Sequence, residues 1–338
     1  MGTGYKVAVF GAYGHTGRFV VAELRSRGFE VLALGRDETR LRDLAGPGIE
    51  VRQAAISVVA SLDGALEGAD AVINAAGPFA DTGAPVIEAA LRAGIPYLDV
   101  AAEIEANVDT FAHFADRAAG ATVIPAMAFF GGLGDLLVTD AMGDWTSADE
   151  AHVAYALSNW HPTPGTRAAG KVSRERRNGQ RLRFSGGRLE HRDDALPSLD
   201  WDFPAPLGKR AVLGEFTMAD VVTVPSHLAI PEVVTYMTAD AAKDVVAPDT
   251  PTPAAADESG RSAQTFVVDV VVRRGAEERR IVARGQDIYA VTAPLVVEAV
   301  ERVLDGRVKA SGVVSAGEAF DAADFLAALA PHVTVERP

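Results

Sequence analysis

The sequence predicts an α/β protein: a doubly wound parallel sheet, followed by a second α+β domain built on a mostly antiparallel sheet. Three observations lead to this prediction. Short apolar segments alternate with helical patterns from residue 5 to about residue 125, as βαβ units require. Glycines 11, 14 and 17 stand between the first strand-like segment and the first helical one. The second half instead carries longer β-like runs.

The expected strands of the first half are short and apolar, and they lie at Lys6–Phe10, Glu30–Leu34, Glu50–Ala54, Ala71–Ala75, Tyr97–Val100 and Thr122–Ile124. The expected helices lie between them, at Gly17–Arg27, Thr39–Ala45, Ser57–Leu66, Gly83–Ala93 and Ile104–Ala119. Apolar strands of this kind are typical of a parallel sheet that helices cover on both faces. Right-handed crossovers then give the strand order of a Rossmann-type fold.

The second half predicts a different architecture. A strand at Ala151–Ser158 precedes a polar helix at Gly165–Asn178, and further β-like segments lie at Arg181–Leu189, Val212–Val224, Val233–Thr238, Val267–Arg273 and Glu278–Ala283. The last two segments flank a short turn and are expected to form a hairpin. Residues 247–264 are rich in Pro, Ala, Ser and Asp without periodicity, which predicts a mobile surface loop.

We therefore expect a nucleotide-binding domain at residues 1–130 and a substrate and dimerisation domain at residues 131–288. Residues 289–338 carry two further helical patterns, Tyr289–Leu304 and Ala319–Leu329, which we expect to return to the first domain.

Composition excludes several classes of function. The net charge of −14 argues against a nucleic-acid partner, because phosphate binding needs a basic face. No cysteine is present, which excludes disulfides, iron–sulfur clusters and thiol catalysis and fits a reducing, cytoplasmic compartment. No apolar run is long enough to span a membrane, and the first residues do not read as a signal peptide. The seven histidines are scattered, so no metal site is expected.

The glycine triplet predicts a dinucleotide site. Gly11 permits a tight turn after the first strand, Gly14 lets backbone amides approach a pyrophosphate, and Gly17 lets the helix lie close to the strand. The N–H groups at the helix start then face the phosphates. We expect the backbones of Tyr13, His15 and Thr16, which lie between these glycines, to take part as well.

Arg36 predicts the type of dinucleotide. The second strand of a Rossmann domain ends with an acidic residue when the ligand has a free 2′-hydroxyl, and an arginine nearby accommodates a 2′-phosphate. Here the second strand leads into Gly35 and Arg36, and Asp37 reads as the start of the next helix. We therefore expect NADP(H), with Gly35 and Arg36 beside its adenosine.

Beyond the glycines, a longer set of segments resembles the saccharopine dehydrogenase-like superfamily, including its trans-acting enoyl reductase-like branch. The segments that carry this resemblance are Asn74–Phe79, Gly83–Val86, Ala93–Glu103, Pro125–Asp135 and His161–Thr166. The resemblance implies an NADP-dependent reductase that often forms dimers, with Ala76, Gly77 and Pro78 beside the cofactor. This sequence departs from the family pattern at Ala102, where glycine is usual. It also departs at residues 129–134, which replace a Phe-Asp-Ser-x-Pro turn.

Reduction of an imine or of an activated C=C or C=O needs a proton donor within hydrogen-bond reach of the substrate. Asp99, Glu103 and His161 are our candidate catalytic residues, and Asp135, Tyr155 and Tyr289 could also supply a proton. Each has a structural alternative: a carboxylate near a helix start can serve as a cap or a solvated first-turn acid, and a histidine can simply pack. The basic cluster at residues 174–177 could receive an anionic substrate or merely form a solvated face.

The expected function is reduction of a small to medium metabolite by NADPH in a homodimer without a nucleic-acid or membrane partner. A short-chain dehydrogenase is excluded because no Tyr-x-x-x-Lys motif is present. The alternative from another class is a non-catalytic NADP-binding redox sensor or scaffold.

Overall fold

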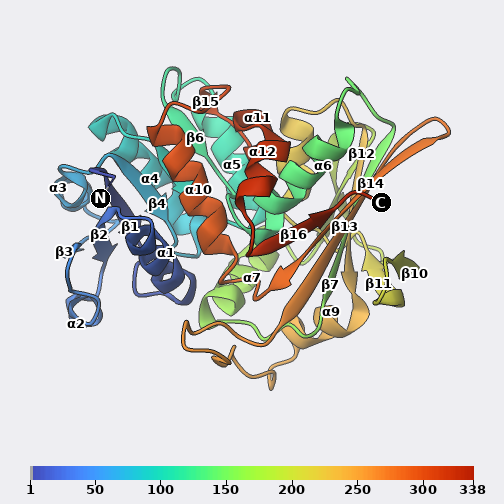
Figure 1. Cartoon of the computed structure of the whole chain (residues 1–338), viewed down its shortest axis with the longest axis horizontal. Helices are drawn as coiled ribbons and strands as arrows, with labels where there is room; N and C mark the ends of the chain where they lie inside the picture. Colours follow the sequence, from blue (N-terminus) through green and yellow to red (C-terminus); the bar gives the residue numbers. More distant parts are fainter. Residues whose placement is uncertain (1–2) are drawn as a thin grey trace.

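The computed structural model describes residues 3–338, which form two sheets joined by helices (Figure 1). The first sheet is parallel and has the order β15-β6-β5-β4-β1-β2-β3. Its strands are β1 (Lys6–Phe10), β2 (Glu30–Gly35), β3 (Ile49–Gln53), β4 (Ala71–Asn74), β5 (Tyr97–Asp99), β6 (Thr122–Ile124) and β15 (Gly312–Val313). This order is that of a doubly wound fold, and it reverses between β1 and β4, which is where such folds bind ligands.

Helices cover both faces of this sheet, as the sequence predicts. They are α1 (His15–Ser26), α2 (Glu38–Arg42), α3 (Val59–Leu66), α4 (Phe79–Ala93) and α5 (Ile104–Phe114). Side chains alternate across β1: Val7 and Val9 belong to one apolar cluster, whereas Ala8 and Phe10 belong to another on the opposite face. The predicted strands of this half agree with the observed ones to within one or two residues.

The second sheet has the order β10-β11-β12-β7-β13-β14-β16, with the β8–β9 hairpin attached to β12. Its strands are β7 (Glu150–Leu157), β8 (Arg181–Ser185), β9 (Arg188–Arg192), β10 (Ser198–Phe203), β11 (Gly208–Gly214), β12 (Glu232–Thr238), β13 (Thr265–Arg274), β14 (Glu277–Gln286) and β16 (Val333–Glu336). Among the strands of residues 3–338, β7 and β12 form the one parallel pair of this sheet. The predicted hairpin is present as β13 and β14.

Two predicted strands were wrong in part. The segment Arg181–Leu189 is not one strand, because Gly186 and Gly187 have φ values of +58° and +76° and turn the chain into the β8–β9 hairpin. The segment Val212–Val224 is a strand only as far as Gly214, and its apolar end forms α8 (Asp220–Thr223) and the short helix η2 (Val224–Ser226). A short buried apolar run can form either type of structure, so periodicity did not separate them.

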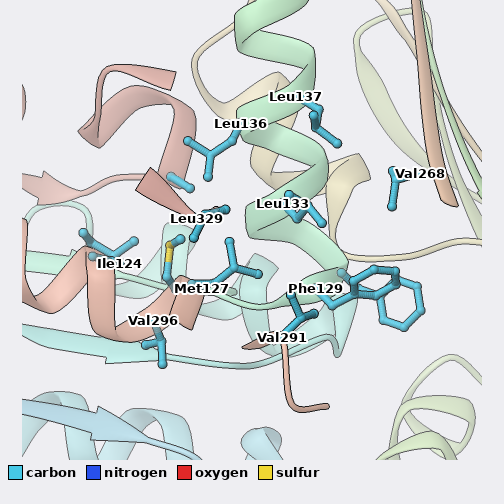
Figure 2. Close-up of a cluster of buried hydrophobic side chains, with 14 of the residues drawn as sticks. Ile124, Met127, Phe129, Leu133, Leu136, Leu137, Val268, Val291, Val296 and Leu329 are labelled. Atoms are coloured by element: carbon cyan, nitrogen blue, oxygen red, sulfur yellow. The ribbon is translucent and has the colours of Figure 1, made fainter. Parts of the chain in front are cut away.

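The remaining helices follow β6 in the chain. They are η1 (Phe129–Leu133), α6 (Gly134–Met142), α7 (Pro164–Arg176), α9 (Ala239–Val246), α10 (Thr292–Leu304), α11 (Ala316–Ala319) and α12 (Ala322–Ala328). Residues 247–264, all of them described, form neither helix nor strand. One continuous apolar core fills the junction, where side chains from η1, α6, α10 and α12 meet around Met127 and Leu133 (Figure 2).

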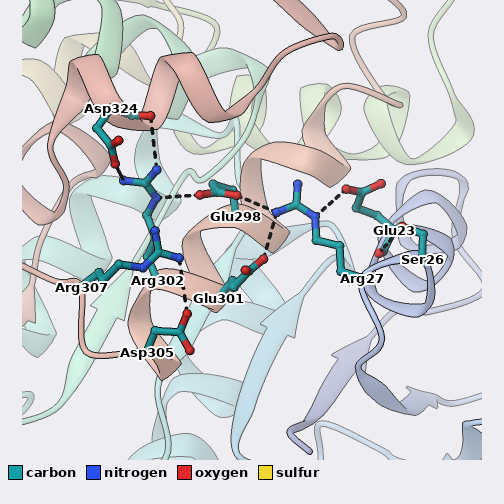
Figure 3. Close-up of polar contacts among 9 residues, drawn as sticks. All are labelled: Glu23, Ser26, Arg27, Glu298, Glu301, Arg302, Asp305, Arg307 and Asp324. Carbon is teal, nitrogen blue, oxygen red and sulfur yellow. Dashed lines mark hydrogen bonds and ion pairs between the residues drawn. The ribbon is translucent and has the colours of Figure 1, made fainter. Parts of the chain in front are cut away.

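The C-terminal segment contacts both sheets. Helix α10 lies along α1, and β15 pairs with β6 of the first sheet, whereas β16 pairs with β14 of the second. A chain of ion pairs fixes this arrangement (Figure 3). The buried Glu298 accepts hydrogen bonds from Arg27 of α1 at 2.6 Å and from Arg302 at 2.7 Å, and Arg302 also reaches Asp324 of α12 at 2.7 Å.

Candidate cofactor and active site

The turn after β1 requires glycine for steric reasons. Gly11 has a φ of +87°, and a Cβ added there would lie 2.8 Å from the backbone nitrogen of Ala76. At Gly17 a Cβ would lie 2.2 Å from the carbonyl oxygen of Gly11. Such distances are far inside van der Waals contact, so larger residues would push α1 away from β1 and β4. This is the close approach that the glycine spacing predicts.

The start of α1 offers unpaired backbone donors. Gly14 is the N-cap residue, and within residues 3–338 no side chain caps this helix start. The first-turn amides, including those of His15 and Thr16, therefore face outward at the carboxyl end of β1. A helix start with free N–H groups and a positive dipole end binds anions such as a pyrophosphate. The residues present at this turn thus fit a dinucleotide.

The carboxyl end of β2 is lined by two arginines and one tyrosine. The Tyr13 ring lies against Gly35, where an added Cβ would be 2.5 Å from the ring. The Arg40 guanidinium lies 4.4 Å from the centroid of the same ring. Arg36 is exposed, and its carbonyl accepts a hydrogen bond from Gln53. Asp37 is the N-cap of α2, because its carboxylate accepts the N–H of Arg40 at 3.1 Å.

Asp37 therefore caps α2, as the sequence predicts, and the exposed Arg36 and Arg40 bring positive charge to this edge. Sequence reasoning missed Arg40, since its contact with Tyr13 joins residues 27 positions apart. The only available signal was its spacing of four residues from Arg36 at the start of a helix.

The loop after β4 is held by side-chain hydrogen bonds. The Asn74 side chain accepts the N–H of Ala76 at 3.1 Å, and Gly77 and Pro78 then lead into α4. The Glu103 carboxylate accepts the N–H groups of Phe79 at 2.9 Å and Ala80 at 3.3 Å. Burial raises the pKa of Glu103, and these two amide donors act against that rise.

Asp99 lies at the end of β5 and is almost fully buried. One of its carboxylate oxygens accepts the N–H groups of Ala101 at 2.9 Å and Ala126 at 2.8 Å, and the other accepts the Tyr97 hydroxyl at 2.9 Å. Burial raises the pKa of Asp99 to about 6. The side chain thus joins the loops after β5 and β6.

His161 comes from the second domain, between β7 and α7. Its imidazole is partly exposed and makes no hydrogen bond to the described part of the chain, whereas its carbonyl accepts the Tyr289 hydroxyl at 3.4 Å. Thr163 caps α7 by accepting the N–H of Thr166 at 3.0 Å. The His161–Thr166 segment identified in the sequence therefore begins α7, which lies between the two halves of the molecule (Figure 1).

The basic cluster of α7 docks this helix on the first domain. Arg176 pairs with Asp109 at 2.7 Å, and Arg177 lies 3.3 Å from Glu105, both acids belonging to α5. Ser173 also donates to Glu105, at 2.5 Å. Two arginines of the cluster are therefore committed to interdomain ion pairs. This finding removes them as free receptors for an anionic substrate.

Two other candidate proton donors lie in the protein interior. Asp135 is fully buried and binds His227 at 2.8 Å and the N–H of Gly317 at 2.7 Å. Tyr155 is fully buried and donates to Asp220 at 2.8 Å. Burial raises the pKa of Asp220 to about 7. Asp135 thus joins α6 to α11 and to the residue after η2, whereas Tyr155 joins β7 to α8.

Within the described residues, no three His, Cys, Asp or Glu side chains come together in a way that could hold a metal ion. None of the helices that residues 3–338 form combines the length and the apolar character that a membrane crossing requires.

Comparison with solved structures places the whole chain in a known fold. It matches apo saccharopine dehydrogenase (L-Glu forming) from Saccharomyces cerevisiae with a TM-score of 0.66, over 99% of this chain and 100% of that one. The chain has a saccharopine dehydrogenase-like fold. The two sequences are 12% identical, so this likeness concerns the fold. The resemblance read from the sequence is confirmed at this level.

The first domain of this protein also matches known proteins by sequence. Residues 11–123 match the family model of NAD(P)H-binding domains. A lipid droplet localized protein from Caenorhabditis elegans is 36% identical over an alignment of 113 residues, which covers 29% of this chain. The match spans 26% of that relative's length. The family match thus supports NAD(P) binding by the first domain, within a fold that saccharopine dehydrogenase shares.

Proposed function

We propose that the protein is an NADPH-dependent reductase that transfers a hydride to an imine or to an activated C=C or C=O of a small to medium metabolite. The observation that carries this proposal is the uncapped start of α1 at the point where the strand order reverses between β1 and β4. That position is where doubly wound folds bind dinucleotides. When bound, the reduced nicotinamide would supply the hydride.

The preference for NADPH rests on the charges at the end of β2. Arg36 and Arg40 are both exposed there, and Arg40 lies over the Tyr13 ring. A guanidinium can pair with a 2′-phosphate and stack on an aromatic plane. The acid that could instead bind a 2′-hydroxyl, Asp37, already caps α2. These contacts favour the phosphorylated cofactor.

For the proton we propose His161. Its imidazole is partly exposed in the segment that leads into α7, and it is not committed to a hydrogen bond with the described chain. Asp99 and Glu103 remain candidates, but their oxygens already accept backbone amides around the β4 and β5 loops. We propose that these two carboxylates position the loops that border the nicotinamide, while His161 holds the proton for the substrate.

Stopped-flow mixing of the protein and NADPH with a panel of imines, enoyl thioesters and ketones tests this function. We expect oxidation of NADPH with at least one class of acceptor. The His161→Ala variant should retain NADPH affinity and lose rate by about a hundredfold or more, as loss of a proton donor does. Tight NADPH binding without oxidation by any acceptor would favour the alternative, a non-catalytic redox sensor or scaffold.

A further inference from the structure

The turn between β14 and α10 places Tyr289 where the two halves of the molecule meet. Asp287 is fully buried, and one of its carboxylate oxygens accepts the N–H groups of Tyr289 at 2.9 Å and Ala290 at 3.0 Å. Its other oxygen accepts the N–H of Ser262 at 2.7 Å. Asp287 therefore fixes the backbone of Tyr289 independently of the contacts that the Tyr289 side chain makes.

The ring of Tyr289 contacts the dinucleotide turn. Its centroid lies 5.2 Å from that of the His15 imidazole, with an interplanar angle of 89°, and His15 makes a similar edge contact with Phe19 at 5.4 Å. Edge-to-face pairs at such distances are favourable. Burial lowers the pKa of His15 and thereby favours its neutral form, against the opposing charge of Asp287. His15 belongs to the first turn of α1, whose amides face the pyrophosphate site.

The hydroxyl of Tyr289 contacts one segment of the second domain at four points. It lies 2.9 Å from the Thr166 hydroxyl and 3.3 Å from the Trp160 indole nitrogen, which donates to it. The N–H of Thr163 donates to it at 3.4 Å, and it can donate to the His161 carbonyl at 3.4 Å. One side chain thus ties the start of α7 to the start of α1.

We propose that Tyr289 is a positioning residue of the cofactor site: its ring braces His15, and its hydroxyl sets the Trp160–Thr166 segment against the bound dinucleotide. The proposal rests on the proposed function, because it assumes that NADPH occupies the turn after β1. The far part of α7 is already held by Glu105 and Asp109 on α5. The Tyr289 hydroxyl fixes the near end, next to the candidate proton donor.

Two substitutions separate the roles of the ring and the hydroxyl. Tyr289→Phe retains the ring contact with His15 and removes the hydroxyl, whereas Tyr289→Leu removes both. Tyr5→Phe is the matched control, because the Tyr5 hydroxyl makes one hydrogen bond, to Leu304 at 3.2 Å, at the other end of α10. NADPH affinity is measured by fluorescence titration, and the NADPH-induced rise in Tm is measured for each variant.

We expect Tyr289→Phe to weaken NADPH binding by about fivefold to tenfold, because the Trp160–Thr166 segment loses all four contacts of the hydroxyl. Binding of NADH should weaken by the same factor, because the affected contacts do not involve the 2′-phosphate. Tyr289→Leu should weaken the binding of NADPH and of NADH further, and Tyr5→Phe should leave both affinities unchanged. Amide hydrogen exchange should accelerate in residues 160–166 of Tyr289→Phe but not of Tyr5→Phe.

Unchanged NADPH affinity in Tyr289→Phe would overturn the proposal, as would equal losses in the two phenylalanine variants. Faster exchange spread over the whole chain would overturn it too, because the hydroxyl would then serve global stability. If the unmodified protein does not bind NADPH at all, the proposed function itself fails, and the titration of that protein alone reveals this.

Discussion

The Glu103 Oε1 atom lies 2.9 Å from the backbone nitrogen of Phe79, the first residue of α4. A carboxylate that follows β5 thereby holds the chain directly after Gly77 and Pro78, in the loop after β4. The loops after β4 and β5, which we propose border the nicotinamide, are thus joined by one side chain. This relationship gives Glu103 a positioning role that its place in the sequence did not reveal.

Substituting Glu103 by Gln tests that role. Glutamine has the same shape and keeps one acceptor oxygen, so one of the two bonds, to Phe79 or Ala80, survives. We expect a loss of about 1–2 kcal/mol in the free energy of unfolding and a modest weakening of NADPH binding. Turnover with the acceptor found by stopped flow should fall by less than about tenfold. A loss above a hundredfold at unchanged NADPH affinity would instead make Glu103 the proton donor.

The Gly17→Ala substitution tests the close approach of α1 to β1. The added methyl group would lie 2.2 Å from the Gly11 carbonyl oxygen, so the turn must shift. We expect unfolding free energy to fall by more than about 2 kcal/mol and NADPH affinity to fall at least about tenfold. Gly64→Ala is the control, because Gly64 lies in α3 with no atom within 4 Å of an added Cβ among the described residues. It should stabilise the protein by up to about 1 kcal/mol.

The first half of the fold was readable from the sequence because each element carried its own signal. A run such as Val7–Phe10 is apolar throughout, and the glycines at 28 and 94 mark the ends of α1 and α4. Similarly, Asp37 followed by helix-forming residues identified a cap. Local composition and the glycine spacing thus sufficed for the sheet and for the dinucleotide turn.

The site as a whole was harder to predict from the sequence, because its contacts join residues that are far apart in the chain. Glu103 reaches Phe79 across 24 positions, and Tyr289 reaches Thr166 across 123 positions. Asp135 and Asp99 look alike in the sequence as acids near helix starts, yet one binds His227 in the core and the other joins two loops. Such pairings depend on tertiary packing, which leaves no periodic signal.

Asp220 predicts a pH-dependent stability. Burial raises its pKa to about 7, far above that of an exposed aspartate. Below about pH 4 Asp220 is protonated in both the folded and the unfolded forms, so it does not reduce the free energy of unfolding. As pH rises toward 7, ionisation favours the unfolded form, and stability falls by an amount on the order of 2–4 kcal/mol.

In the Asp220→Asn variant this decrease in stability with rising pH should be absent, because asparagine keeps an acceptor for the Tyr155 hydroxyl but does not ionise. Urea midpoints of both proteins, measured from pH 5 to pH 8, provide the comparison. We expect the variant to gain stability relative to the unmodified protein as pH rises. Parallel pH profiles would show that Asp220 does not titrate in this range.

The ion pairs between α1, α10 and α12 predict a stability effect without a functional one. Glu298→Gln removes a buried charge that Arg27 and Arg302 share, and we expect a loss of about 2–3 kcal/mol in unfolding free energy. Glu88→Gln is the control, since Glu88 pairs with Arg117 on the surface and should change stability by less than about 1 kcal/mol. NADPH affinity should be unaltered in both variants, and a large change in it would tie this network to the cofactor site.

Calorimetric titration of NADPH and NADH into the unmodified protein and Arg36→Ala tests whether the dinucleotide binds and whether Arg36 selects the phosphorylated form. We expect NADPH to bind more tightly than NADH, and Arg36→Ala should weaken NADPH about tenfold to a hundredfold while changing NADH less than about threefold. Equal losses for both cofactors would remove Arg36 from the account. Absence of binding by either cofactor to the folded protein would contradict the proposed reductase function.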